Sequence, residues 1–259
     1  MTTVELDPQL RRRIREDLPV ALDRGELFAL FQPQVELATR RVVAAEALAR
    51  WRHPTIGEVS PKVFIEVAED ADEIGRVSRF MLDAACRQVG EWRAAGLDLS
   101  VSVNVSPLEL SSPSFCTDVL EVLRRWDAPP SAVTLEVTET KELHDVDAFL
   151  GCIAGAREEG LGISVDDYGA GFASLRRMYE LHASEVKIDR SLIKRGFVDE
   201  VREIVAEAHR RGARIVAEGV ETIDDLDVAR AMHCDRAQGW LFGRAMSADD
   251  VAQLARRRV

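Results

Sequence analysis

Polar residues recur in this chain at the points where short, apolar, strand-like runs end. The set comprises carboxylates, amides and one lysine: Glu46, Asn104, Glu136, Asp166, Asp167, Lys187, Glu218 and Gln238. Carboxylate and amide oxygens are the ligands that Mg²⁺ and Mn²⁺ prefer, and the set offers no soft sulfur ligand. The pattern therefore predicts a site for hard metal ions that is assembled from the ends of several strands.

The excess of negative charge in this set predicts two metal ions. If the carboxylates gather at one place they repel one another, and Lys187 alone brings too little positive charge to offset them. Two ions about 3.5–4 Å apart, with a bridging carboxylate, are the common arrangement for phosphoester hydrolysis. The adjacent Asp166 and Asp167 suit this arrangement, because one side chain can bridge while its neighbour binds a single ion.

The elements that must position these residues alternate between strands and helices. The strand-like runs are Leu27–Leu37, Arg41–Leu48, Leu99–Val105, Val133–Val137, Leu161–Val165, Glu185–Ile188, Arg214–Ala217 and Ala237–Phe242. Eight strands in a 259-residue chain favour a closed α/β barrel of the TIM type over an open sheet. The first connection is too short for a helix, so we expect a hairpin with its turn at residues 38–40.

Helical patterns with readable ends lie between most of these runs. In the first, Asp7 is the expected N-cap, Pro8 the first residue, and Gly25 the stop. One helix is expected to open at Ser60-Pro61, and three others to cover Asp72–Ala95, Asp145–Glu159 and Val198–Arg211. A further helix is expected from Ser112-Pro113 to near Trp126. The last two are expected to open with the cap pairs Thr222/Asp225 and Ser247/Asp250.

Composition excludes several classes of protein. The net charge of −11 argues against broad binding of DNA, RNA or an anionic membrane, and no apolar run approaches the length of a membrane span. The five histidines lack the spacing of a zinc site. The four cysteines form no CxxC motif and no signal peptide precedes them, so we expect reduced thiols in a cytoplasmic protein.

At these motifs the chain resembles the EAL domain, a phosphodiesterase family that hydrolyses the second messenger cyclic di-GMP. Eight ordered motifs carry the resemblance: Phe31-Gln32-Pro33, Glu46-Ala47-Leu48, Val103-Asn104-Val105, Leu135-Glu136-Val137, Asp166-Asp167-Tyr168-Gly169, Val186-Lys187-Ile188-Asp189, Ala217-Glu218-Gly219-Val220 and Gln238-Gly239-Trp240. The resemblance covers about residues 10–257, so we expect one EAL-type barrel domain over residues 1–259.

The resemblance implies a barrel with an antiparallel first strand and a role for each strand-end residue. Glu46, Asn104, Glu136 and Asp166 would hold one Mg²⁺ or Mn²⁺ ion, and Asp166, Asp167 and Glu218 the second. Glu218 would act as general base, Lys187 would position the attacking water, and Gln238 would bind a water attached to a metal. Gln32 and Arg50 would contact the substrate, while Glu139 and Glu221 would support loops. The expected product is the linear dinucleotide pGpG, and the expected assembly is a homodimer.

Departures from the family pattern leave alternatives open. Ala170 and Ala173 stand where Thr and Ser are usual, in the loop that follows the aspartate pair. A catalytically weak or inactive domain that serves as a cyclic di-GMP receptor or interaction module is therefore the main alternative. A barrel enzyme that abstracts a proton beside a carboxylate, with Lys187 as base, is a more distant one. A sensor or cyclase domain outside this chain would supply regulation.

Overall fold

The computed structural model describes residues 7–110, 112, 114–137, 146–168, 178, 180–195 and 198–257, without the side chains of residues 107, 108, 146–148, 167 and 198–200. The strands are β1 (Leu27–Glu36), β2 (Arg41–His53), β3 (Gly57–Val59), β4 (Ser100–Val105), β5 (Val133–Val137), β6 (Gly162–Tyr168), β7 (Glu185–Ile188), β8 (Arg214–Ala217) and β9 (Arg236–Gln238). The helices are α1 (Pro8–Asp23), α2 (Pro61–Asp70), α3 (Ile74–Ala94), α4 (Pro107–Leu110), α5 (Phe115–Arg125), the short 3₁₀ helix η1 (Pro130–Ala132), α6 (Val146–Glu158), α8 (Arg190–Arg195), α9 (Val198–Arg210), α10 (Ile223–Ala231) and α11 (Ala248–Ala255).

The strands form a closed barrel. Their order is β1-β9-β8-β7-β6-β5-β4-β2, β1 also pairs with β2 to close the ring, and β3 adds to the outer part of β2. Strand β1 runs antiparallel to both of its neighbours, whereas β2 and β4 to β9 pair in parallel. The expected α/β barrel with an antiparallel first strand is confirmed, and so is the β1–β2 hairpin.

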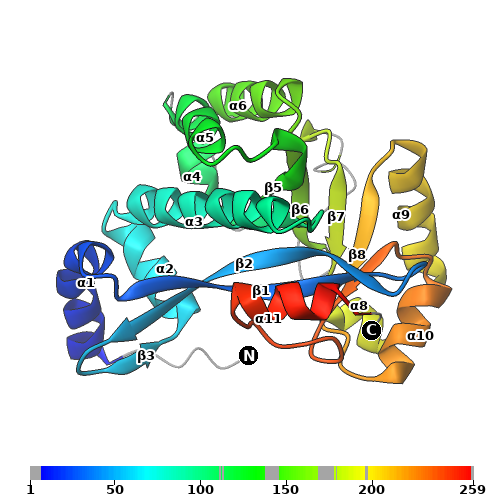
Figure 1. Cartoon of the computed structure of the whole chain (residues 1–259), viewed down its shortest axis with the longest axis horizontal. Coiled ribbons are helices and arrows are strands. Elements are labelled where there is room, and N and C mark those ends of the chain that lie inside the picture. Colours follow the sequence, from blue (N-terminus) through cyan, green and yellow to red (C-terminus); the bar gives the residue numbers. More distant parts are fainter. Residues whose placement is uncertain are drawn as a thin grey trace.

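Alternation along the strands separates an apolar outer face from a polar inner face. Strand β5 is buried along its whole length: Val133, Leu135 and Val137 belong to the apolar core, while Thr134 and Glu136 alternate with them. The core residues pack against the surrounding helices, as Figure 1 shows for α3, α5 and α6 around the barrel. On β5 the inner face is thereby left to Thr134 and Glu136.

A second, smaller core lies beside the barrel. The β1–β2 ribbon extends toward α1 and α2, where Ile14, Trp51 and Phe64 pack together (Figure 1). Helix α1 begins as expected, because the Asp7 carboxylate accepts a hydrogen bond from the Gln9 N–H at 3.0 Å. Gly25 adopts a positive φ of 68° after the helix, a backbone conformation that favours glycine.

The ends of three strands differ clearly from expectation. Strand β6 continues to Tyr168 rather than ending at Val165. Strand β2 continues to His53, since β3 pairs with its outer part. Strand β9 stops at Gln238 rather than at Phe242, because the chain turns in against the segment after β8: the Val220 N–H donates to Gln238 O at 3.1 Å, and the Leu241 N–H donates to Val220 O at 3.1 Å. This close approach needs Gly239.

The expectation of four reduced thiols is wrong for two of the cysteines. Cys116 in α5 and Cys152 in α6 are joined in a disulfide, whereas Cys86 and Cys234 are free and buried. The absence of a CxxC motif could not exclude this pair, because packing of two helices brings together residues 36 positions apart.

Gly239 provides a test of this packing. A Cβ at residue 239 would lie 2.1 Å from Val220 O, whereas a Cβ at Gly151 in α6 would meet nothing within 4 Å. We expect Gly239→Ala to lower the free energy of unfolding by about 2 kcal/mol or more, and Gly151→Ala to raise it by about 0.5–1 kcal/mol. Urea unfolding of both variants measures this, and equal stabilities would contradict the described turn.

Candidate active site at the carboxyl ends of the barrel strands

A buried lysine lies among four carboxylates inside the barrel mouth. The Lys187 ammonium is 2.7 Å from Glu218 Oε1, 3.0 Å from Glu136 Oε2, 3.1 Å from Asp166 Oδ1 and 3.3 Å from Glu46 Oε2. Only 1% of the Lys187 side chain and none of that of Glu136 is exposed. Four carboxylates around one ammonium leave an excess of negative charge in a place with little water.

Strand register brings these residues together. Gln32 lies opposite Glu46 in the β1–β2 pair, and Asn104 lies opposite Glu136 in the β4–β5 pair. Carboxyl ends of parallel strands meet at one end of a barrel, so residues from β2 and from β4 to β8 converge there.

Amide side chains hold one carboxylate of the cluster in place. Glu46 Oε1 accepts a hydrogen bond from Asn104 Nδ2 at 2.9 Å, and Glu46 Oε2 accepts one from Gln238 Nε2 at 2.6 Å. Gln238 is itself fixed, since its Oε1 accepts a bond from Gln34 Nε2 at 3.1 Å and its Nε2 donates to Gln32 Oε1 at 3.3 Å. Glu46 is thus oriented by two donors in addition to Lys187.

Burial and neighbouring charges shift the protonation of the two central glutamates. Burial raises the pKa of Glu218 to about 8, and the charge of Asp166 adds to this rise although Lys187 opposes it. Burial, with the repulsion from Glu46, also raises the pKa of Glu136 well above its ordinary range. A carboxyl group with a pKa close to neutral can accept and release a proton at physiological pH, which is what a general base requires.

Lys187 and Glu46 are held in their charged forms. Burial lowers the pKa of Lys187, but the attraction of Glu136, Glu218 and the other carboxylates outweighs it, so the pKa lies well above its ordinary value. Burial raises the pKa of Glu46, but Lys187 and the amide of Gln238 outweigh it, and the pKa is lowered. This ion pair is therefore the fixed part of the cluster.

The donor set fits hard divalent cations. Glu136 Oε1 is buried and accepts no hydrogen bond from any group in the described part of the chain, so it has an unused acceptor. Among the described side chains, no group of three His, Cys, Asp or Glu residues has an arrangement that could hold a metal ion. The carboxylates of the cluster converge on the Lys187 ammonium instead. Carboxylate and amide oxygens with excess negative charge are nevertheless the chemistry that Mg²⁺ and Mn²⁺ bind.

The remaining predicted residues divide into three groups. The side chains of Asp167 and Glu139 lie outside the described residues. Glu221 does not reach Lys187: its carboxylate pairs with Arg190 at 3.1 Å. Arg50 lies beside the cluster, in the wall of a cavity, where its Nη1 donates to the Ala49 carbonyl at 2.8 Å.

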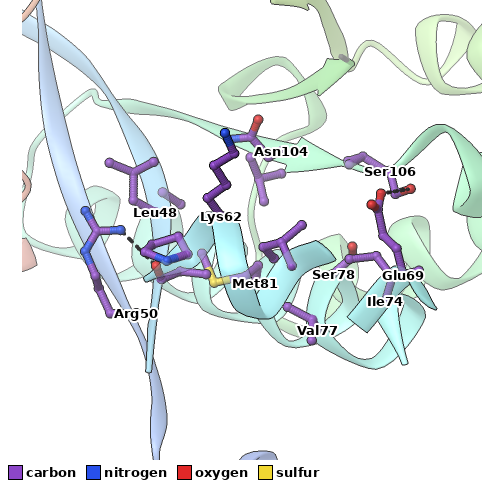
Figure 2. A pocket seen from close by; sticks show the side chains of 16 residues that line it. Leu48, Arg50, Lys62, Glu69, Ile74, Val77, Ser78, Met81, Asn104 and Ser106 are labelled. Atoms are coloured by element: carbon purple, nitrogen blue, oxygen red, sulfur yellow. Dashed lines mark hydrogen bonds between the residues drawn. The ribbon is translucent and has the colours of Figure 1, made fainter. Parts of the chain in front are cut away.

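The cavity that contains Arg50, here called the Arg50 cavity, has a volume of about 270 Å³ between β2, α2, α3 and β4. Figure 2 shows Lys62 extending toward Asn104 at one side and Glu69 with Ser106 at the other. Apolar walls are given by Leu48, Val77 and Met81, among others. Ser106 Oγ donates to Glu69 Oε1 at 3.3 Å. One end of the cavity is therefore cationic and adjoins the cluster, and the other end carries a carboxylate.

A second cavity of about 250 Å³ opens directly on the cluster. Its lining includes Gln32, Glu46, Glu218 and Gln238 together with Trp240, so we call it the Trp240 cavity. Trp240 is 55% exposed, and the Arg244 guanidinium lies 3.7 Å from the centre of its ring. Glu46 lines the Trp240 cavity, and the next residues of its strand, Ala47 and Leu48, line the Arg50 cavity.

Sequence reasoning missed several residues of these cavities. Gln34 could have been found, because it lies two positions from Gln32 on one strand and so shares its face. Glu69 and Lys62 carry no such signal, since their position depends on how α2 docks beside the barrel. Trp240 was noted as part of a motif but not as an exposed aromatic at the site mouth.

A sequence profile of the EAL domain matches residues 15–245. The chain belongs to the EAL domain family. MucR of Pseudomonas aeruginosa, a bifunctional diguanylate cyclase and cyclic di-GMP phosphodiesterase, is 35% identical over 256 residues, which are 96% of this chain and 37% of that protein. A cyclic di-GMP phosphodiesterase of the same organism is 32% identical over 246 residues, 93% of this chain and 42% of that protein. The chain thus spans under half the length of these relatives.

Solved structures of EAL domains share the fold. The PaMucR phosphodiesterase in complex with c-di-GMP superposes with a TM-score of 0.84 at 36% identity, over 92% of this chain and 99% of that one. The EAL domain of Mycobacterium smegmatis DcpA gives a TM-score of 0.75 at 29% identity, over 91% of this chain and 98% of that one. Within the described residues, no helix has the length and apolar character needed to cross a membrane.

The Lys187 cluster predicts a metal-dependent stability. Without divalent ions, Lys187→Met leaves buried carboxylates uncompensated, and we expect the free energy of unfolding to fall by about 3–5 kcal/mol. Mg²⁺ or Mn²⁺ should restore part of the loss. The control Lys62→Met removes an exposed lysine and should change stability little. Urea unfolding with chelator and then with metal measures this; an unchanged midpoint for Lys187→Met in chelator would be against the account.

Glu109 in α4 predicts a pH-dependent stability away from the cluster. Its side chain is buried with Oε2 unpaired among the described groups, and burial raises its pKa to about 7. Because the pKa is raised in the folded state, stability is lost as pH rises from about 4.5 through 7. Glu109→Gln should therefore be more stable than the parent at pH 8 by up to about 3 kcal/mol, and similar to it at pH 4.

Glu121→Gln, which changes an exposed carboxylate on α5, is the control and should shift stability by less than about 0.5 kcal/mol at either pH. Urea unfolding at the two pH values gives the comparison. The same pH dependence in Glu109→Gln as in the parent would refute this assignment.

Proposed function

We propose that this chain is a metal-dependent phosphodiesterase that hydrolyses cyclic di-GMP to pGpG. The observation that carries the proposal is the buried group of Glu46, Glu136, Asp166 and Glu218 around Lys187 at the barrel mouth. Membership of the EAL family and the likeness to the structure of a phosphodiesterase in complex with c-di-GMP support it.

The proposed metal ligands follow from the cluster. Glu46, Asn104, Glu136 and Asp166 would hold one Mg²⁺ or Mn²⁺ ion; Asp166, Asp167 and Glu218 would hold another, with Gln238 acting through a water. Bound ions would polarise the phosphodiester and stabilise the negative charge that develops on it. The protein groups orient these ligands in advance, as the amides of Asn104 and Gln238 do for Glu46.

Lys187 and Glu218 would act on the attacking water. Their side chains are 2.7 Å apart, so a water that replaces this contact would be within reach of both. Lys187 has N–H donors to orient the water, and Glu218 accepts its proton as the phosphorus is attacked. The Lys187 ammonium would also offset negative charge as the leaving oxygen departs.

The two cavities suit the two halves of a cyclic dinucleotide. The Arg50 cavity has apolar walls and ends at Glu69, whose carboxylate could accept the N–H donors on the Watson–Crick edge of a guanine. At its other end, Arg50 and Lys62 would meet a phosphate. The Trp240 cavity offers an exposed indole on which the second base could stack. The proposal includes the homodimer that the family resemblance implies, and a cytoplasmic location.

Glu136→Ala tests the catalytic assignment. Loss of a ligand to the first metal should reduce pGpG formation at least about 100-fold. Glu185→Gln is a matched control, because Glu185 is also a glutamate on a barrel strand, 1% exposed, but pairs with Arg214 at 2.6 Å away from the cluster. Chromatography of pGpG, with folding of both variants checked by circular dichroism, is the measurement. Parental turnover by folded Glu136→Ala would refute the assignment.

The same assay distinguishes the receptor alternative. If the parent hydrolyses cyclic di-GMP in Mg²⁺ or Mn²⁺ and a chelator abolishes this activity, the assignment as an enzyme is supported. Calorimetric binding of cyclic di-GMP in Ca²⁺ without pGpG in any metal would instead show a receptor and overturn the proposal.

A further inference from the structure

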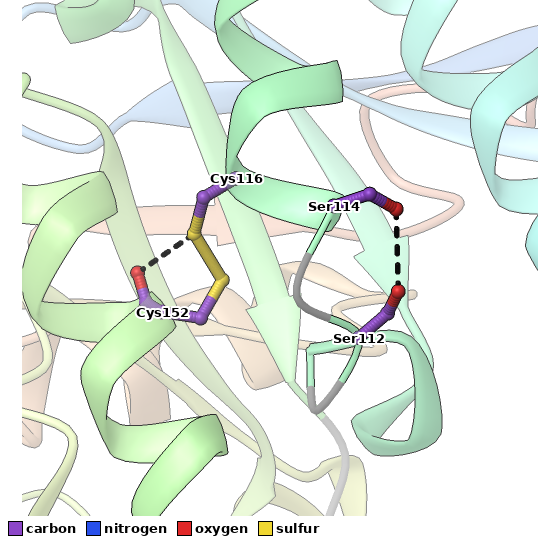
Figure 3. Close-up of a disulfide and its surroundings, with 4 residues drawn as sticks. All are labelled: Ser112, Ser114, Cys116 and Cys152. Atoms are coloured by element: carbon purple, nitrogen blue, oxygen red, sulfur yellow. Dashed lines mark hydrogen bonds between the residues drawn. A yellow bond between two sulfur atoms is a disulfide. The ribbon is translucent and has the colours of Figure 1, made fainter.

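Two helices that flank a metal-ligand strand are joined by a disulfide. Cys116 lies near the start of α5 and Cys152 lies within α6, and their Cα atoms are 6.0 Å apart, a distance typical of disulfides. Figure 3 shows the sulfur–sulfur bond between the two helices. The bond is not part of the proposed catalytic site.

The four cysteines differ in their access to solvent. Cys86 and Cys234 are buried, and burial raises the pKa of each thiol to about 12, so neither forms a reactive thiolate near neutral pH. Cys116 is only half-buried. Cys116, in the disulfide, is thus the partly exposed cysteine of the four, whereas the two free cysteines are buried.

The position of the bond connects it with the site. Cys116 and Cys152 are 36 residues apart, and the ring that they close contains α5, η1 and β5. Strand β5 carries Glu136, the fully buried carboxylate 3.0 Å from Lys187. Asn104 lies on β4, which pairs with β5. A covalent link between α5 and α6 restricts the opened and unfolded states of the chain that includes β5, so it should disfavour local opening of this strand.

We propose that Cys116 and Cys152 form a reversible redox modification site that sets the rigidity of the segment carrying Glu136. The oxidant is a low-molecular-weight disulfide such as oxidised glutathione. The Cys116 thiolate attacks it, giving a mixed disulfide and one glutathione thiolate. The Cys152 thiolate then displaces the second glutathione. The two protein thiols lose two electrons and two protons, which leave with two molecules of reduced glutathione.

Thiol counting tests the chemistry. Protein incubated with oxidised or with reduced glutathione is denatured, alkylated with iodoacetamide and weighed by mass spectrometry. We expect two alkylated cysteines after oxidation and four after reduction, with peptide mapping assigning the protected pair to residues 116 and 152. Four alkylated cysteines, or glutathione left as a mixed adduct, under every oxidising ratio would overturn the proposal.

Hydrogen exchange tests the consequence for the site. We expect amides of β5 to exchange at least roughly tenfold more slowly in the oxidised than in the reduced protein. The double variant Cys116→Ala/Cys152→Ala should exchange as the reduced parent does in both buffers. The control Cys86→Ala/Cys234→Ala should keep the difference between the two forms. Equal β5 exchange in oxidised and reduced parent would refute the link to Glu136.

Thermal unfolding provides a second readout if the control Cys86→Ala/Cys234→Ala folds poorly. Oxidation should raise the melting temperature of the parent by at least about 4 °C and leave that of Cys116→Ala/Cys152→Ala unchanged. An equal rise in both proteins would place the redox effect elsewhere and overturn the proposal. This experiment does not depend on catalysis, so it stands apart from the proposed function.

Discussion

The compensation of buried negative charge by Lys187 is the interaction on which the site depends. Four carboxylates from β2, β5, β6 and the end of β8 approach one ammonium within 3.3 Å. Without it, the barrel mouth would hold uncompensated charge in a region of low dielectric constant. Burial, together with repulsion between the carboxylates, raises the pKa of Glu136 and of Glu218 although Lys187 opposes this rise. The same excess that costs stability would, in the proposed enzyme, favour the binding of divalent cations.

The barrel accommodates this charge because buried polar side chains, among them Gln34, Ser102 and Ser164, alternate with the outward-facing core residues along its strands. At the opposite end from the cluster, Arg214 donates to Glu185 at 2.6 Å, and Arg236 lies 3.7 Å from the same oxygen. Cohesion comes from the outer face, where alternating aliphatic residues such as Leu135 and Val137 meet the helices. Packing and chemistry are thereby assigned to opposite faces of the same strands.

Much of this arrangement could be predicted from the sequence. Alternation and strand–helix order gave the barrel, and the short connection after Leu37 gave the antiparallel hairpin, because these are local signals. The contact of Lys187 with Glu46 joins residues 141 positions apart, and only closure of the barrel creates it. The helix docking that forms the Arg50 cavity, and the Cys116–Cys152 bond, are likewise products of tertiary packing. Residue type at strand ends was enough to select Glu46, Glu136 and Lys187, which the structure brings together. Glu69 and Lys62, whose positions depend on helix docking, could not be selected in this way.

The central claim is that the cluster lacks positive charge and takes it up as metal ions. Titration of the metal-free protein with Mn²⁺ by isothermal calorimetry tests this most directly, with Glu136→Ala titrated alongside. The account predicts two Mn²⁺ ions per parent chain and weaker binding to Glu136→Ala, the variant that removes a proposed ligand. A folded parent that binds no Mn²⁺ at millimolar concentration would contradict it.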